Sequence, residues 1–297
     1  MGANLKEVRD RMKSVQNTQQ ITKAMKMVSA AKLRRAQDSI TQLRPYANKL
    51  GEILSHLAAN VESESVATLS EKRKVGSAII VVITSNKGLC GAFNSNVIKA
   101  TTRKIETDYA HLKDNSGLKL VFIGKKGYEF FKNRYPAVEK VTGYIDLVER
   151  LTFEEVAAMA DLLIKRFKEA KYDRVSIAYA EFKNAAIQNF NVEAFLPIPE
   201  SEDHNAQTNT SADYIFEPNE DELMEHLVPS ILQTQLYKCI LDTHASEHGA
   251  RMTAMDKATD NASELLKELK INYNKARQEA ITRELSEIVG GAAALEG

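Results

Sequence analysis

The C-terminal part of the chain, from about residue 219 to residue 289, reads almost throughout as one helix with a narrow seam of small and apolar residues. The seam consists of Met252, Met255, Thr259, Ala262, Leu266, Leu269, Tyr273, Ala276 and Ala280. Its steps alternate between three and four, which is the 3.5-residue repeat of a coiled coil. Unbroken, such a helix would be roughly 100 Å long. It cannot bury its own seam, so it needs a partner helix.

The N-terminal residues predict that partner. Leu5, Val8, Met12 and Val15 follow the same alternation, and the register continues into the polar residues Gln19 and Thr22. Polar seam positions weaken a coiled coil but fix its register. A second apolar set then restarts on a shifted phase at Ile21, Met25 and Val28. We expect a helix to about Val61, kinked or broken locally at Pro45, that pairs with the C-terminal helix in antiparallel fashion.

Between these helices the sequence predicts a compact α/β insert. Strands are expected at 77–84, 118–123, 174–182 and 190–198, helices at 93–109, 125–134 and 152–170, and a weak strand or loop at 138–146. Alternating strands and helices indicate a mostly parallel sheet. The predicted fold class is therefore α/β: a long antiparallel coiled coil of N- and C-terminal helices with an inserted Rossmann-like βαβ globular domain. The expected boundaries are 1–61, 75–200 and 213–297.

Composition excludes several classes of protein. The formal net charge is zero, which argues against bulk attraction to nucleic acid. Two cysteines, Cys90 and Cys239, provide no disulfide framework. The N-terminal residues lack the apolar core of a signal peptide, and the longest apolar run, 78–83, is too short to span a bilayer. We expect a protein that can work at a membrane but does not cross it.

No catalytic, cofactor or metal motif stands out. The turn from Gly88 to Gly91 follows a predicted strand and could suggest a phosphate site, but it lacks the G-x-G-x-x-G spacing, and no phosphate-loop motif exists. His244 and His248 lie four residues apart on the C-terminal helix without an evident third ligand. We expect no cofactor, no metal and no catalytic role of the chain's own.

Positive charge is concentrated on the first helix. Lysines and arginines outnumber acidic residues between residues 6 and 44, in a chain that is neutral overall. Two interpretations stay open: a solvated basic face, or a face that meets an acidic partner surface. Nothing in the pattern matches a known nucleic-acid-binding module.

Four segments carry a resemblance to a known family. Residues 15–25, 84–91, 246–255 and 281–292 resemble, in order, segments of the gamma subunits of F-type ATP synthases. Asn86 and Lys87 stand where an acidic and a basic residue are common in that family. The resemblance runs from end to end of the chain.

The resemblance implies a non-catalytic rotor subunit. Its coiled coil would sit inside a ring of three alpha and three beta subunits, and its α/β foot would rest on the membrane c-ring and bind epsilon. Ion flow would then drive ATP synthesis, and ATP hydrolysis would drive ion pumping. The implied location is the cytoplasmic side of a bacterial cell membrane, bound peripherally, in a complex that also contains delta. A coiled-coil scaffold with an α/β head, or a nucleotide-binding enzyme, would be the alternatives.

The resemblance also implies roles for individual residues. The contacts with the alpha–beta head are Arg251, Gln278, Thr282 and Glu284. The contacts with the acidic lever of beta are Met25, Lys87 and Cys90. The contacts of the foot with the c-ring or epsilon are Tyr214 and Glu217. Two alternatives stay open: Met25 can serve coiled-coil packing, and the aromatic residue Tyr214 can cap the core of the foot.

Overall fold

The computed structural model describes residues 5–60, 64–149, 151–198 and 220–296. The chain divides into two compact units. One, which we call the helical unit, comprises Met1–Ser29 and Arg251–Gly297; the other, the α/β unit, comprises Ala30–Ala250. Each unit is described in turn.

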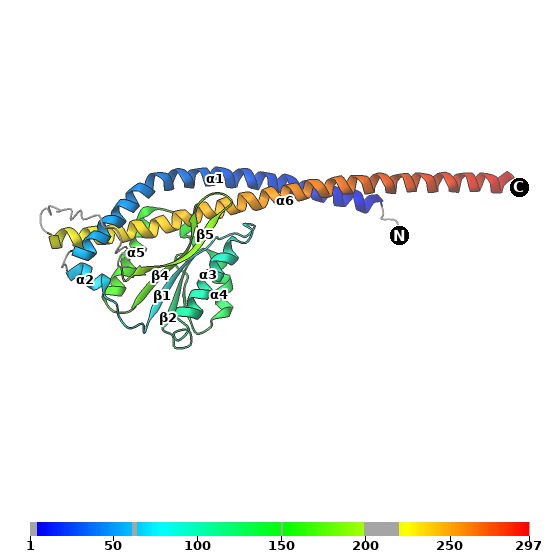
Figure 1. Cartoon of the computed structure of the whole chain (residues 1–297). Helices are drawn as coiled ribbons and strands as arrows, with labels where there is room; N and C mark the ends of the chain where they lie inside the picture. Colours follow the sequence, from blue (N-terminus) through cyan, green and yellow to red (C-terminus); the bar gives the residue numbers. More distant parts are fainter. Residues whose placement is uncertain (1–4, 61–63, 150, 199–219, 297) are drawn as a thin grey trace. The chain divides into compact units, whose positions relative to one another are not determined.

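Two long helices, α1 and α6, contribute to both units (Figure 1). Helix α1 spans Leu5–Asn60 and helix α6 spans Glu220–Glu296, as the heptad pattern predicts. Helix α1 continues through Pro45, so of the kink or break that we expected there, the break does not occur. Pro45 and Thr41, whose carbonyl loses its helical partner there, are both exposed, so water can satisfy that carbonyl.

The helical unit is an antiparallel pair of helices. Arg9 lies opposite Tyr273 and Lys26 opposite Asp256, so the position on α6 falls as the position on α1 rises. Every predicted seam residue from Met252 to Ala280 is buried or half-buried. The predicted antiparallel coiled coil is confirmed within this unit.

The shifted apolar set predicted on α1 was wrong. Ile21 is 60% exposed and Val28 57% exposed, whereas Thr22 and Ser29 are buried. The original register therefore continues, with small polar side chains in the seam. Thr259 donates a 2.8 Å hydrogen bond to the hydroxyl of Thr22, which explains why a polar residue can occupy this position.

The α/β unit is built on a five-stranded sheet with the order β3-β2-β1-β4-β5. The strands are β1 (Ala78–Ile83), β2 (Leu118–Ile123), β3 (Glu139–Val141), β4 (Arg174–Phe182) and β5 (Gln188–Leu196). All neighbouring pairs are parallel except β4 and β5, so the predicted mostly parallel sheet is confirmed. The central strand β1 is buried on both faces, as its continuous apolar run indicates.

Helices cover both faces of this sheet. The shorter helices are α2 (Glu64–Ser70), α3 (Phe93–Asp108), α4 (Lys125–Arg134), α5 (Phe153–Lys168) and a 3-10 turn at Ile145–Val148. Alternate residues of β1 belong to two cores, as the two-residue period of a strand requires. One core contains side chains of α5 and of the parts of α1 and α6 in this unit; the other contains side chains of α3 and α4.

Candidate functional site

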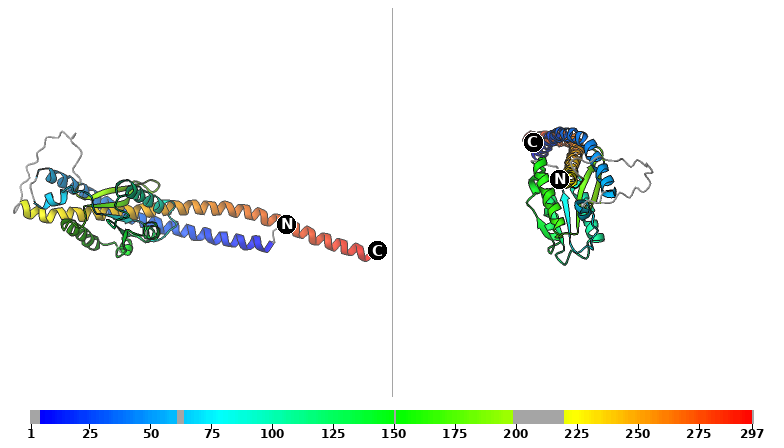
Figure 2. Two further views of the ribbon diagram at one scale, coloured as in Figure 1. Left: turned by 90° about the horizontal axis from the view of Figure 1, so that it is seen from below. Right: turned by 90° about the vertical axis from the view of Figure 1, so that its left-hand side faces the viewer.

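The C-terminal end of α6 has no partner helix in the described part of the helical unit. Figure 2 shows α6 continuing past the first residues of α1. Every residue from 281 to 292 is exposed. The large apolar residues among them are Ile281 (46% exposed), Leu285 (56%), Ile288 (67%) and Val289 (66%). Four exposed apolar side chains on a helix end without a partner helix are typical of a protein interaction surface.

These apolar residues form a stripe that is separate from the coiled-coil seam. At 100° per residue, Ile281, Leu285 and Val289 share one face of α6. That face lies roughly 150° around the helix from the seam that ends at Ala280. The stripe is therefore not a continuation of the surface that packs on α1. We call Ile281, Leu285 and Val289 the tip stripe.

Two of the four predicted head contacts lie beside the tip stripe. Gln278 and Thr282 are exposed and share its face, whereas Glu284 is exposed but points away from it. Arg251 lies at the other end of the seam and is only 7% exposed. The structure thus groups Gln278 with Thr282 and leaves Arg251 and Glu284 outside this group.

The turn after β1 is held by a network of hydrogen bonds in the α/β unit. The hydroxyl of Ser85 donates to the carbonyl of Lys87 at 2.7 Å, and the side chain of Asn94 donates to Ser85 Oγ at 2.8 Å and to Cys90 Sγ at 3.2 Å. Asn94 Oδ1 also accepts from the Ser85 backbone N–H at 3.0 Å. The thiol of Cys90 belongs to this network and is only 2% exposed.

The turn presents a leucine that sequence reasoning missed. Leu89 is 65% exposed and has a φ of 62°, a left-handed conformation that is uncommon for a residue without a short polar side chain. Its sequence signal was present: an apolar residue inside a glycine-rich turn. The predicted contact Lys87 is exposed, whereas Cys90 holds the turn together from inside.

The other residues predicted to contact the lever or the foot are placed as follows. Met25 is half-buried in the helical unit, which leaves coiled-coil packing and partner contact both open. Tyr214 and Glu217 lie outside the described residues.

An ion pair between the partly exposed Arg44 and the buried Asp242 joins α1, α6 and β4 within the α/β unit. The guanidinium of Arg44 donates to Asp242 Oδ1 at 3.1 Å and to the carbonyl of Phe182 at 3.0 Å. The side chain of Asp242 is 1% exposed, and its Oδ2 has no hydrogen-bond partner among the described atoms. Burial raises the pKa of Asp242 above 3.8, and Arg44 opposes that shift. Burial also raises the pKa of the Cys239 thiol.

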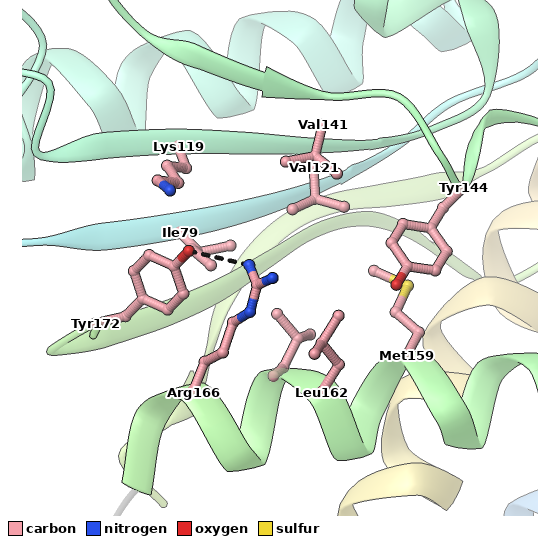
Figure 3. Close-up of a pocket in the computed structure, with 10 residues that line it drawn as sticks. Ile79, Lys119, Val121, Val141, Tyr144, Met159, Leu162, Arg166 and Tyr172 are labelled. Atoms are coloured by element: carbon pink, nitrogen blue, oxygen red, sulfur yellow. Dashed lines mark hydrogen bonds between the residues drawn. The ribbon is translucent and has the colours of Figure 1, made fainter. Parts of the chain in front are cut away.

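A cavity between the sheet and α5 is too small for a nucleotide. Figure 3 shows its walls, in which Arg166 reaches the hydroxyl of Tyr172 at 3.3 Å. Its volume is about 30 Å³, enough for one or two water molecules. This cavity gives the nucleotide-binding hypothesis no support.

The paired histidines of α6 also lack the surroundings of a metal centre. The Nε2 atoms of His244 and His248 are 3.1 Å apart. Among the described residues no cluster of three metal-ligating side chains occurs. In the same part of the chain, no helix combines the length and apolar character that crossing a membrane requires.

Comparisons with known proteins agree on one family. The family model described as ATP synthase matches residues 4–295. The ATP synthase gamma chain of Flavobacterium johnsoniae is 52% identical over 297 residues, covering 99% of this chain and 100% of that one. The gamma chain of Cytophaga hutchinsonii is 48% identical, with 98% and 99% covered.

Solved structures show the same architecture. A central stalk and c-ring structure of the Tetrahymena thermophila mitochondrial ATP synthase matches 80% of this chain and 99% of its own, with 26% identity and a TM-score of 0.57. A chain of the Euglena gracilis mitochondrial ATP synthase in rotational state 3 covers 98% of this chain and 94% of its own, with a TM-score of 0.63; at 21% identity it supports the fold alone. The chain belongs to the family of ATP synthase gamma chains.

Proposed function

We propose that this chain is the central rotor stalk of a rotary ATP synthase and transmits torque between a membrane c-ring and a head of three alpha and three beta subunits. The observation that carries the proposal is the tip stripe of Ile281, Leu285 and Val289. These side chains are exposed on a helix end without a partner in the described part of the helical unit. They require a surrounding protein surface, and a ring of head subunits supplies one.

The chain's role in this proposal is mechanical rather than catalytic. A single helix end has no threefold symmetry, so it cannot contact three identical beta subunits alike. Its angle therefore sets three different free energies for three chemically identical sites. Rotation driven by ion flow would cycle each site through binding, synthesis and release, and ATP hydrolysis would reverse the cycle.

Torque transmission requires that the two helices do not slide along each other. The seam contains polar contacts at defined positions, such as Gln19 with Ser263 and Thr22 with Thr259. Sliding by one residue would separate both pairs and break their part-buried hydrogen bonds. These pairs support a shaft with a fixed register.

We assign the lever contact to the exposed residues of the turn after β1. Lys87 offers a positive charge and Leu89 an apolar side chain, both at the surface. Cys90 then acts indirectly, because its buried thiol helps to hold the turn. On the shaft, Met25 is the corresponding contact, and Met25→Lys should add a charge-assisted bond to the acidic lever and impair coupling.

We assign the foot contact to Tyr214 and Glu217, on family resemblance alone. The foot would meet the c-ring and epsilon on the cytoplasmic side of a bacterial cell membrane, with the chain bound peripherally. Replacing both residues by alanine should uncouple the complex or release its soluble part from membranes. The ATPase activity of the soluble part should stay unchanged. A fully coupled, membrane-bound double variant would exclude these residues.

Reconstitution tests the proposed function. The chain is mixed with purified alpha and beta subunits, and assembly and ATPase activity are measured. We expect a stable complex whose ATPase activity falls with Leu285→Glu, because that change places a charge in a closed apolar sleeve. Glu287→Gln, on the opposite face of α6, is the matched control. If the chain were a scaffold instead, it would form no complex with alpha and beta, or the ATPase activity of the complex would not change with Leu285→Glu.

A further inference from the structure

A second surface lies between helices α3 and α4. A cleft of about 610 Å³ opens there. Its lining consists of Ser95, Ile98, Lys99, Thr102, Arg103, Phe130 and Arg134. Neither the rotor function nor the implied partner contacts use any of these residues.

The charge of this cleft is of one sign. Three of its lining residues, Lys99, Arg103 and Arg134, are cationic, and none is acidic. Lys99 and Arg103 form no ion pair with any described residue. A cleft with this lining attracts an anion.

The neighbouring acidic residues are already engaged by other lysines. On α3, Glu106 pairs with Lys113 at 2.9 Å. On α4, Glu129 pairs with Lys126 at 2.6 Å. Glu106 also interacts electrostatically with Arg134, so the positive charge that remains fully available to a ligand is that of Lys99 and Arg103.

The remaining lining is apolar with a few hydroxyl groups. Phe130 is 44% exposed although most phenylalanine side chains of this unit are buried, and Ile98 is half-buried. The hydroxyl of Thr102 is buried and has no hydrogen-bond partner among the described atoms. An aromatic face beside guanidinium and ammonium groups suits a ligand with a flat apolar body and an anionic head.

We propose that the cleft between α3 and α4 binds a small organic anion, with a flat apolar body against Phe130 and a phosphate or carboxylate head on Lys99, Arg103 and Arg134. Size favours a small ligand over a protein segment. The volume lies within the usual 300–1,000 Å³ of small-molecule sites. A stable protein interface would need about 800 Å² from each partner, and seven lining residues do not provide it.

The test is calorimetric titration of the full chain with 1-naphthyl phosphate, which carries both the body and the head. We expect saturable 1:1 binding with a Kd below about 1 mM. Arg103→Gln and Phe130→Ala should each weaken binding about tenfold or more. Lys125→Gln is the matched control, because Lys125 lies on α4 outside the cleft. Its affinity should equal that of the unchanged chain.

Further titrations test which part of the ligand is bound, and whether the ligand is a lipid headgroup or a soluble anion. Inorganic phosphate and 1-naphthol, each offering only half of the chemistry, should bind at least about tenfold more weakly. Vesicles containing phosphatidylglycerol distinguish a lipid headgroup from a soluble anion. The proposal is overturned if only vesicles bind, if 1-naphthyl phosphate does not saturate, or if Arg103→Gln and Phe130→Ala bind it as the control does. Thermal melting of each variant confirms that these exposed positions leave the fold intact.

Discussion

Gln19 Nε2 donates a 2.6 Å hydrogen bond to Ser263 Oγ and so joins two residues that are 244 positions apart in the chain. Both side chains are half-buried in the seam between α1 and α6. Apolar side chains can pack in several registers of a coiled coil, whereas the two partners of a polar hydrogen bond meet in only one. The pair therefore gives up some stability for a defined alignment of the two helices.

The Gln19–Ser263 pair should show a coupling energy in a double-mutant cycle. Gln19→Ala and Ser263→Ala should each lower the free energy of unfolding by about 1 kcal/mol, because each removes a part-buried hydrogen bond. The double variant should lose less than the sum of the two. Urea unfolding followed by circular dichroism measures all four proteins. Gln16→Ala, at an exposed position of α1, should change nothing, and strictly additive losses would contradict the coupling.

The seams could be predicted from the sequence because a 3.5-residue spacing leaves few alternatives. The apolar pattern nevertheless assigned Ile21 and Val28 wrongly to the seam. Both are exposed, and the buried seam residues are the neighbouring Thr22 and Ser29. Small hydroxyl residues can enter a seam when the partner helix offers a hydrogen bond, and Thr259 offers one. A single sequence does not reveal that pairing, because it depends on which residues of α6 lie opposite.

The Arg44–Asp242 pair should stabilise the α/β unit in a pH-dependent way. Arg44→Gln leaves a buried carboxylate without its counter-charge and should lower the free energy of unfolding by about 2 kcal/mol at pH 8, less than a fully buried pair would lose, since Arg44 is partly exposed. Asp242→Asn in the same chain should restore most of that loss, because no charge then remains buried. Urea unfolding measures both variants.

The sign of the pH dependence follows from burial. The folded-state pKa of Asp242 lies above 3.8 because of desolvation, partly offset by Arg44 and Lys238. The native state therefore holds this proton more tightly than the unfolded chain does. The stability that Asp242 contributes is full below pH 3.8 and is lost as the pH rises through the folded pKa. Removing Arg44 raises that pKa further, so Arg44→Gln should cost less at pH 5 than at pH 8. An equal loss at both values would contradict this.

Gln278 and Thr282 should contribute to the ATPase turnover of the complex but not to the folding stability of the chain. Both are exposed beside the tip stripe, so their polar groups are available to loops of the head. Thr282→Ala should lower the ATPase turnover of the reconstituted complex about fivefold, the value of one hydrogen bond of ~1 kcal/mol. The unfolding free energy of the isolated chain should not change. Glu287→Ala serves as the control, and the assignment fails if both variants turn over alike.

Leu89 should matter for coupling although it does not stabilise the fold. Its side chain is exposed and its left-handed backbone is strained, and asparagine tolerates that conformation better than leucine does. Leu89→Asn should therefore leave the chain as stable as before or slightly more stable. ATP-driven ion pumping by membrane-bound complexes should fall relative to ATP hydrolysis. Unchanged pumping per ATP would remove Leu89 from the proposed lever contact.

The site was less predictable than the fold because its residues are defined by exposure. Residue resemblance pointed to Cys90, yet that thiol is buried against Asn94, and the neighbouring Leu89 reaches the surface instead. The sequence does not state which side chains of the turn point outward. The tip stripe was more predictable than this turn. Its apolar spacing and its angle from the seam follow from the sequence and helical geometry, but the structure was needed to show that α6 continues past the first residues of α1 (Figure 2).

The most direct test of a rotary shaft is to watch it turn. Cys90 and Cys239 are both buried, so a cysteine introduced at the exposed position Lys125 is the preferred target for a maleimide-linked bead. The chain is assembled with alpha and beta subunits fixed to glass, and ATP is added. The account predicts continuous rotation of the bead in one direction, which stops when ATP is withdrawn. ATP hydrolysis by the same complexes with beads that show only undirected motion would contradict it.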